Sequence, residues 1–87
     1  ARQRAEIMLV EQVGRRVVLQ AQTPYRGAHS RHWEVSGGTL SDDSAPSVTW
    51  TLPGTPGIYS AELALDYGDD GLAFDALMLE VLPDASE

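Results

Sequence analysis

Apolar and polar residues alternate along four segments of the chain, and clusters of glycine, proline and serine separate these segments. Successive side chains of a β-strand point to opposite faces of a sheet, so the alternation predicts strands that are each buried on one face. The segments are 15–23, 31–36, 47–52 and 58–67. The residues predicted to face inward are Val17, Leu19, Ala21, Trp33, Val35, Val48, Trp50, Leu52, Tyr59, Ala61, Leu63 and Leu65.

Turn signals recur at short intervals, which favours an all-β antiparallel sandwich over alternating strands and helices. Gly14 and the pair Gly37–Gly38 end two runs, and the corner Pro53–Gly57 suits neither a helix nor a central strand. Residues 40–46 are polar and acidic, so we expect a plain connection there.

Two segments fit a helix as well as a strand. Residues 2–10 are rich in helix formers, and the apolar residues of 72–82 follow a helical spacing. A closed sandwich, however, has no free sheet face for a lone helix to cover, and without a strand at 72–82 one sheet would lack its last strand. The context therefore favours a strand at 72–82, whereas helix and strand both remain open for residues 2–10.

The last two predicted strands constrain each other's register. Directly opposite residues of an antiparallel pair point to the same face, so inward apolar residues should oppose one another. This condition places Tyr67 opposite Ala73 and leaves residues 68–72 as the loop. The inward pairs are then Leu77 with Leu63, Leu79 with Ala61, and Val81 with Tyr59.

The same register predicts an unusually apolar outer face. Phe74 and Met78 would point outward beside Ile58, whereas a sheet face in contact with water is normally polar at alternate positions. Adjacent exposed apolar side chains usually mark a contact surface. Two coverings remain open: the N-terminal segment with Ile7, or a neighbouring domain or second copy.

Length and composition limit the possibilities further. The chain has 87 residues and is 43% hydrophobic, which suits one small folded domain spanning 1–87. It contains no Cys, Asn or Lys, so disulfides, N-glycosylation and lysine-based catalysis are absent from it. No apolar run reaches the roughly 18 residues of a membrane span. We expect the domain to be part of a longer multidomain polypeptide.

Charge is distributed unevenly along the chain. Residues 1–31 contain all six Arg with Glu6 and Glu11, a sum of +4, and the remainder carries eleven acidic groups without a basic one, which gives the net −7. An acidic surface repels nucleic-acid phosphates and anionic lipid. Neither nucleic acid nor a membrane is therefore expected as a partner.

Two groups of residues carry side chains that can bind metal ions. Asp66, Asp69, Asp70 and Asp75 fall within ten residues and could coordinate Ca²⁺, although their spacing is not that of an EF-hand and equally suits a turn. The two histidines, at 29 and 32, flank a loop and a strand and diverge there, so they are interpreted as surface residues.

Catalytic motifs are missing from the sequence. It has no Gly-x-Ser-x-Gly elbow and no glycine-rich phosphate loop, so an enzyme is not predicted and no cofactor is expected. Carbohydrate binding would need exposed aromatic platforms. With both Trp on core faces, the candidates are Tyr25, Tyr67 and Phe74.

Four stretches resemble the PKD-type immunoglobulin-like domain: Trp33–Thr39, Val48–Trp50, Pro56–Tyr59 and Leu77–Val81. The resemblance extends from about Val13 to Val81. It implies an immunoglobulin-like antiparallel β-sandwich of about seven strands, repeated along cell-surface proteins, with a spacer or adhesive role and no catalysis. The expected core residues are Trp33, Trp50, Tyr59, Leu63, Leu77 and Leu79.

We therefore expect a non-catalytic immunoglobulin-like module of a cell-surface, periplasmic or secreted protein that contacts neighbouring domains or another protein. Its candidate interaction surface is Phe74, Met78 and Ile58. Two alternatives remain: a carbohydrate-binding accessory module of a secreted enzyme that binds polysaccharide, and a filament or surface-layer subunit joined through sheet edges.

Overall fold

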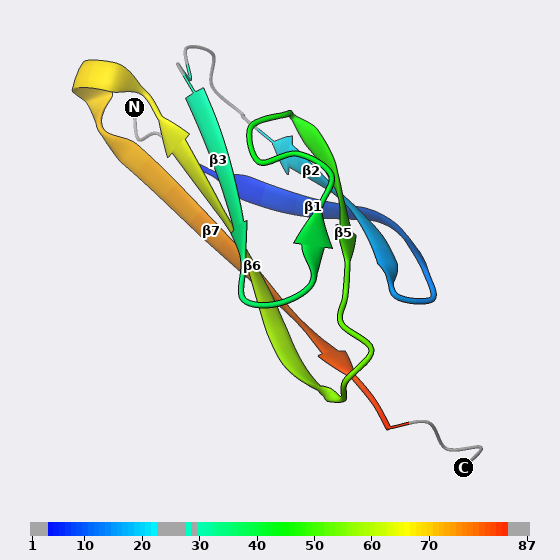
Figure 1. The fold of residues 1–87 in the computed structure, drawn as a ribbon. Helices are drawn as coiled ribbons and strands as arrows, with labels where there is room; N and C mark the ends of the chain where they lie inside the picture. Colours follow the sequence, from blue (N-terminus) through cyan, green and yellow to red (C-terminus); the bar gives the residue numbers. More distant parts are fainter. Residues whose placement is uncertain (1–3, 23–27, 29, 84–87) are drawn as a thin grey trace.

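The computed structural model describes residues 4–22, 28 and 30–83, which form an elongated body of 52 × 17 × 17 Å (Figure 1). Seven strands and one short 3₁₀ turn, Gly68–Asp70, make up its regular structure. The strands are β1 (Glu6–Val13), β2 (Arg16–Gln22), β3 (Ser30–Val35), β4 (Thr39–Leu40), β5 (Ser47–Thr51), β6 (Gly57–Asp66) and β7 (Leu72–Val81).

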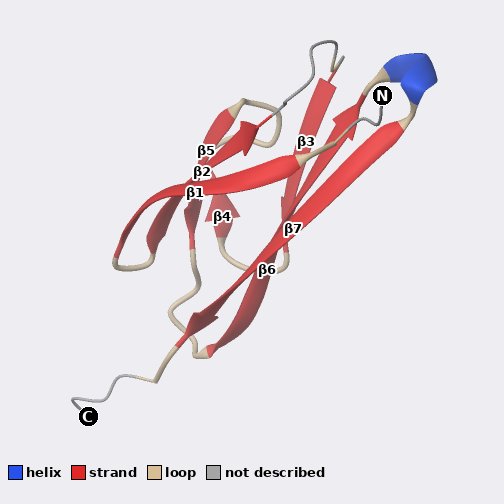
Figure 2. Cartoon of the chain, turned by 180° about the vertical axis from the view of Figure 1, so that it is seen from behind, coloured by secondary structure: helices blue, strands red, loops and turns tan. Residues whose placement is uncertain are grey.

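The strands form two antiparallel sheets (Figure 2). Sheet A has the order β1-β2-β5-β4, and sheet B has the order β3-β6-β7. This is the strand order of constant-type immunoglobulin domains, with four strands in one sheet and three in the other. The predicted fold class, an all-β immunoglobulin-like sandwich, is confirmed.

Both ambiguous segments are strands. Glu6–Val13 pairs with β2 at the edge of sheet A, and Leu72–Val81 pairs with β6 at the edge of sheet B. The prediction that residues 40–46 form no secondary-structure element is wrong for the first of these residues. Leu40 belongs to the two-residue strand β4, which pairs with β5 and completes sheet A.

The core lies between the two sheets, and the inward faces follow the alternation in the sequence. Trp33, Trp50 and Leu63 are at most 1% exposed. Tyr59, Leu77 and Leu79 are only half-buried, because they line the inner face toward its periphery. The fully buried residues are Val17, Leu19, Trp33, Val48, Trp50, Leu52, Ala61, Leu63, Leu65, Tyr67 and Ala73.

Tyr59 forms the expected corner at the start of β6. Its hydroxyl donates a hydrogen bond of 2.7 Å to the backbone carbonyl of Thr55, four residues upstream. The half-buried Tyr59 side chain lies against the turn after β3, where a side chain on Gly37 would collide with its ring. The arrangement matches the tyrosine corner of immunoglobulin-like sandwiches.

The predicted register of the last hairpin is wrong by two residues. Leu77 lies opposite Ala61 instead of Leu63, and Leu79 lies opposite Tyr59. The cause is the turn: the Tyr67 N–H donates to the Gly71 carbonyl at 2.9 Å, so the loop is 67–71. A shift of two preserves the side-chain alternation, so every predicted inward and outward position is retained.

Substitution of two glycines with positive φ, Gly14 (60°) and Gly38 (83°), tests how tightly their turns are packed. We expect Gly14→Ala to lower the free energy of unfolding by about 1 kcal/mol, through the left-handed backbone alone, because its surroundings are open. Gly38→Ala should cost roughly 3–5 kcal/mol, because its Cβ would also overlap the Thr51 carbonyl oxygen. Urea unfolding of both variants provides the measurement. Equal losses would contradict the packing of the β3–β4 turn.

Candidate interaction surface

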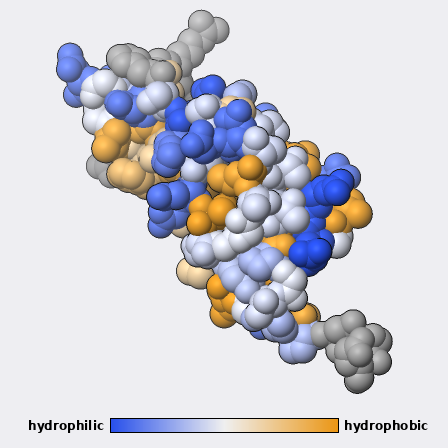
Figure 3. Space-filling model, viewed as in Figure 1, coloured by the Kyte–Doolittle hydropathy of each residue, from blue (hydrophilic) through white to orange (hydrophobic). Residues whose placement is uncertain are grey.

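The outer face of sheet B is the part of the molecule where exposed apolar side chains lie on neighbouring strands. Ile58 on β6 and Phe74 and Met78 on β7 are each 68% exposed. Ile58 lies opposite Glu80, Met78 opposite Ser60, and Phe74 opposite Ala64, so small and acidic residues fill the positions between them. Figure 3 shows hydrophobic areas that reach the surface among hydrophilic ones.

The apolar side chains continue along β7 as a strip. Leu72, Phe74, Ala76 and Met78 occupy successive outward positions, and Leu72 is 62% exposed. The sequence-based assignment of Phe74, Met78 and Ile58 to the exterior therefore agrees with their positions. A strip of this kind is typical of contact surfaces.

Two glutamates lie side by side in the middle of this face. Glu34 on β3 is directly opposite Glu62 on β6, and both are exposed. Like charges in this position repel each other. The one ion pair among residues 4–22, 28 and 30–83 is between Arg4 and Glu6 in another part of the molecule.

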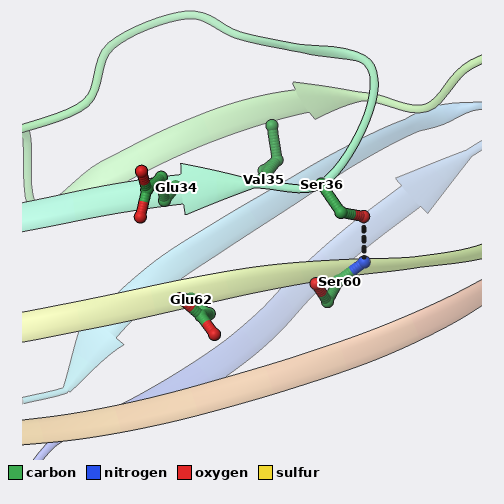
Figure 4. A pocket seen from close by; sticks show the side chains of 5 residues that line it. All are labelled: Glu34, Val35, Ser36, Ser60 and Glu62. Atoms are coloured by element: carbon green, nitrogen blue, oxygen red, sulfur yellow. Dashed lines mark hydrogen bonds between the residues drawn. The ribbon is translucent and has the colours of Figure 1, made fainter.

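A hollow of about 260 Å³ lies between these strands, lined by Glu34, Val35, Ser36, Ser60 and Glu62 (Figure 4). Its wall is held by the Ser60 N–H, which donates to the Ser36 hydroxyl oxygen at 2.9 Å. Pockets that enclose small ligands usually measure about 300–1,000 Å³. This hollow is smaller than that range, whereas a second hollow of about 470 Å³ beside Phe74, lined by Glu62, Phe74, Asp75 and Ala76, lies within it.

The N-terminal segment does not cover the outer face of sheet B. β1 pairs with β2 in sheet A, and Ile7 lies opposite Ala21 on the inner side of that sheet. The expectation that this segment could shield Phe74 and Met78 within the domain is wrong for Glu6–Val13. Pairing with β2 satisfies the backbone of β1 in a way that lying across an outer face would not.

The four aspartates considered for Ca²⁺ have separate positions. The Asp66 carboxylate accepts the Gly68 N–H at 2.8 Å, while Asp69 and Asp70 are exposed in the 3₁₀ turn. Asp75 points inward, opposite Leu63. Within the described part of the chain, no three acidic or histidine side chains are placed to hold a metal ion.

Asp75 has a structural role that sequence reasoning missed. One carboxylate oxygen accepts the Ile7 N–H of β1 at 2.7 Å, and the other accepts the Ala76 N–H at 2.9 Å. The side chain thereby joins the edge strands of the two sheets. The available signal was a single charged residue at an inward position of an otherwise apolar strand.

Tyr67, a candidate aromatic platform for carbohydrate, is only 4% exposed. Its hydroxyl donates to the Arg4 carbonyl at 2.7 Å, which fixes the chain just before β1. Tyr25 and His29 lie outside the described residues, and His32 is exposed on β3. Among the described aromatic side chains, Phe74 alone is an exposed platform.

The loop between β4 and β5 is ordered by Asp42. Its carboxylate accepts the backbone N–H groups of Ser44 at 2.6 Å and Ala45 at 3.0 Å. The hydrogen bonds from Ser44 are the main cause that lowers the pKa of Asp42 below its ordinary 3.8. The ionised side chain therefore favours the folded loop.

Comparison with family models, with curated proteins and with solved structures finds no match to this chain. Within the part of the chain that the structure describes, no helix has the length and apolar character needed to cross a membrane.

Removal of the Asp75 side chain should loosen the joint between β1 and β7. Asp75→Ala leaves the Ile7 N–H without its acceptor, so we expect a loss of about 1–3 kcal/mol in urea unfolding. Hydrogen exchange of the Ile7 amide should accelerate at the same time. Asp69→Ala, in the exposed turn, is the control and should change stability by about 0.5 kcal/mol or less. Unchanged protection of Ile7 would show that the bond does not hold β1.

Acid should weaken the β4–β5 loop through Asp42. Because the folded-state pKa of Asp42 lies below its unfolded value, its contribution is complete above about pH 4 and is lost as the pH falls through the folded-state pKa. We expect Asp42→Asn to flatten the fall in stability below pH 4, measured by thermal unfolding. A variant that follows the wild-type acid profile would contradict this role.

Proposed function

We propose that the chain is a non-catalytic immunoglobulin-like module of the PKD type, which serves as a spacer and protein-contact domain in a cell-surface, periplasmic or secreted protein. The observation that carries the proposal is the outer face of sheet B. Ile58, Phe74 and Met78 are each 68% exposed there and β1 does not cover them. An exposed apolar face of this kind is typical of a domain that binds other proteins.

The path of the chain supports the spacer role. Arg4 is held at the Tyr67 end of the β6–β7 hairpin, whereas β7 finishes at Val81 opposite Gly57, at the other end (Figure 1). Ten residues of extended strand span about 33 Å. A module entered at one end and left at the other lengthens a tandem array with every copy.

The carbohydrate-binding alternative has less support. Stacking of a sugar chain usually needs several exposed aromatic rings. Trp33, Trp50 and Tyr67 are buried, which leaves Phe74 among the described residues that could stack. Protein contact through an apolar and acidic face therefore accounts better for the surface.

The double variant Phe74→Ser with Met78→Ser should fold normally and lose self-association or docking of an adjacent domain. Both side chains are largely exposed, so we expect stability within about 1 kcal/mol of the wild type. Circular dichroism melting tests the fold, and sedimentation equilibrium tests association. The control is Met8→Ser with Leu82→Ser, two exposed apolar residues elsewhere. An unfolded double variant, or one that still associates, would contradict the proposal.

A further inference from the structure

Two surfaces of the sandwich differ in the charge of their described outward side chains. The outer face of sheet B carries the acidic residues Glu34, Glu62, Asp66 and Glu80, and no Arg is at its outward positions. The tip of the β1–β2 hairpin, Val13–Arg16, carries two arginines instead.

The hairpin tip combines charge with exposed apolar surface. Val13 is 66% exposed and pairs with Arg16, which is also exposed and points outward from sheet A. The Arg15 guanidinium donates to the Leu52 carbonyl at 3.0 Å, which anchors the tip to the end of β5. A hollow of about 370 Å³ lies beside it, lined by Val13, Arg15, Arg16 and Thr51. Glu11 is the acidic residue nearest along this face, opposite Val18.

We propose that the outer face of sheet B binds the hairpin tip of a second copy of this chain, with Arg16 of one copy between Glu34 and Glu62 of the next and Val13 against Phe74 and Met78. The proposal rests on the proposed function of this face as a contact surface. The two surfaces are complementary. The outer face of sheet B has two carboxylates beside apolar side chains, and the hairpin tip has an arginine beside a valine. Complementary charges of this kind select the partner and its orientation.

Placement of the two patches determines the kind of assembly. The hairpin tip belongs to sheet A and the acidic face is the outside of sheet B, so the two patches lie on opposite sides of the sandwich (Figure 2). The two patches of one copy cannot both contact the same neighbouring copy. The contact is therefore heterologous, and repetition produces an open head-to-tail chain of modules.

Charge reversal on each side provides the test. Glu34→Arg with Glu62→Arg puts two positive charges at the proposed docking position, and Arg16→Glu puts a negative charge on the residue that docks there. In sedimentation equilibrium at low ionic strength, the wild type should associate, and each variant alone should associate at least tenfold more weakly, because like charges then meet. An equimolar mixture of the two variants should associate again, since each tip then finds a face of opposite charge.

Matched controls carry the same charge changes elsewhere. Asp69→Arg with Asp70→Arg alters the exposed turn, and Arg4→Glu alters the start of the chain before β1. Both should associate like the wild type. Salt provides a second measurement that needs no variant: association should weaken between about 0.05 M and 0.5 M, as the charges become screened.

The outcomes separate this proposal from the function on which it rests. A wild type that stays monomeric at millimolar concentration, or a mixture that stays as weak as its components, overturns the copy-to-copy contact. If Phe74→Ser with Met78→Ser abolishes association and Arg16→Glu does not, the face is still a contact surface and the hairpin tip is not its partner. Recovery of association in the equimolar mixture supports both the copy-to-copy contact and the proposed function of this face.

Discussion

Two buried indole N–H groups fix the connections on either side of β4, because each needs a hydrogen-bond acceptor there. Trp33 and Trp50 are almost fully buried, and a buried N–H without an acceptor costs about 1–3 kcal/mol. Trp33 donates to the Ala45 carbonyl at 2.8 Å, and Trp50 to the Gly37 carbonyl at 2.9 Å. Both acceptors are in the connections on either side of β4. The two largest core side chains therefore also hold the connections on both sides of β4, and the Trp33 backbone N–H donates a further hydrogen bond to the Asp43 carbonyl at 2.8 Å.

The alternation of side chains was enough to predict β2, β3, β5 and β6 and their inner faces. Trp33 and Leu63 occupy the core as expected, because a two-residue period leaves only two choices of face. The candidate surface followed from the same rule, since Phe74 and Met78 lie on the other face of the strand that carries Leu77. Even an error of two residues in register left these assignments intact.

Features that depend on turns or on distant contacts could not be predicted in this way. The register of the last hairpin depends on the Tyr67–Gly71 hydrogen bond, and β4 is too short to show a period. The tie from Asp75 to Ile7 joins residues 68 positions apart. Whether Tyr67 was a surface platform or a core residue depended on its contact with Arg4. The local alternation of residues gives no information about hydrogen-bond partners that are distant in the sequence.

The position of the chain ends has a mechanical consequence. The described chain enters beside the Gly68–Asp70 turn and leaves past Val81, so tension between its ends acts lengthwise on β7. A force parallel to paired strands loads the hydrogen bonds of the β6–β7 ladder together, in shear, whereas a force across the strands would break them one after another. Shear of ten paired residues requires the ladder to yield as a unit. The same hairpin that sets the length of the module thus also resists its extension.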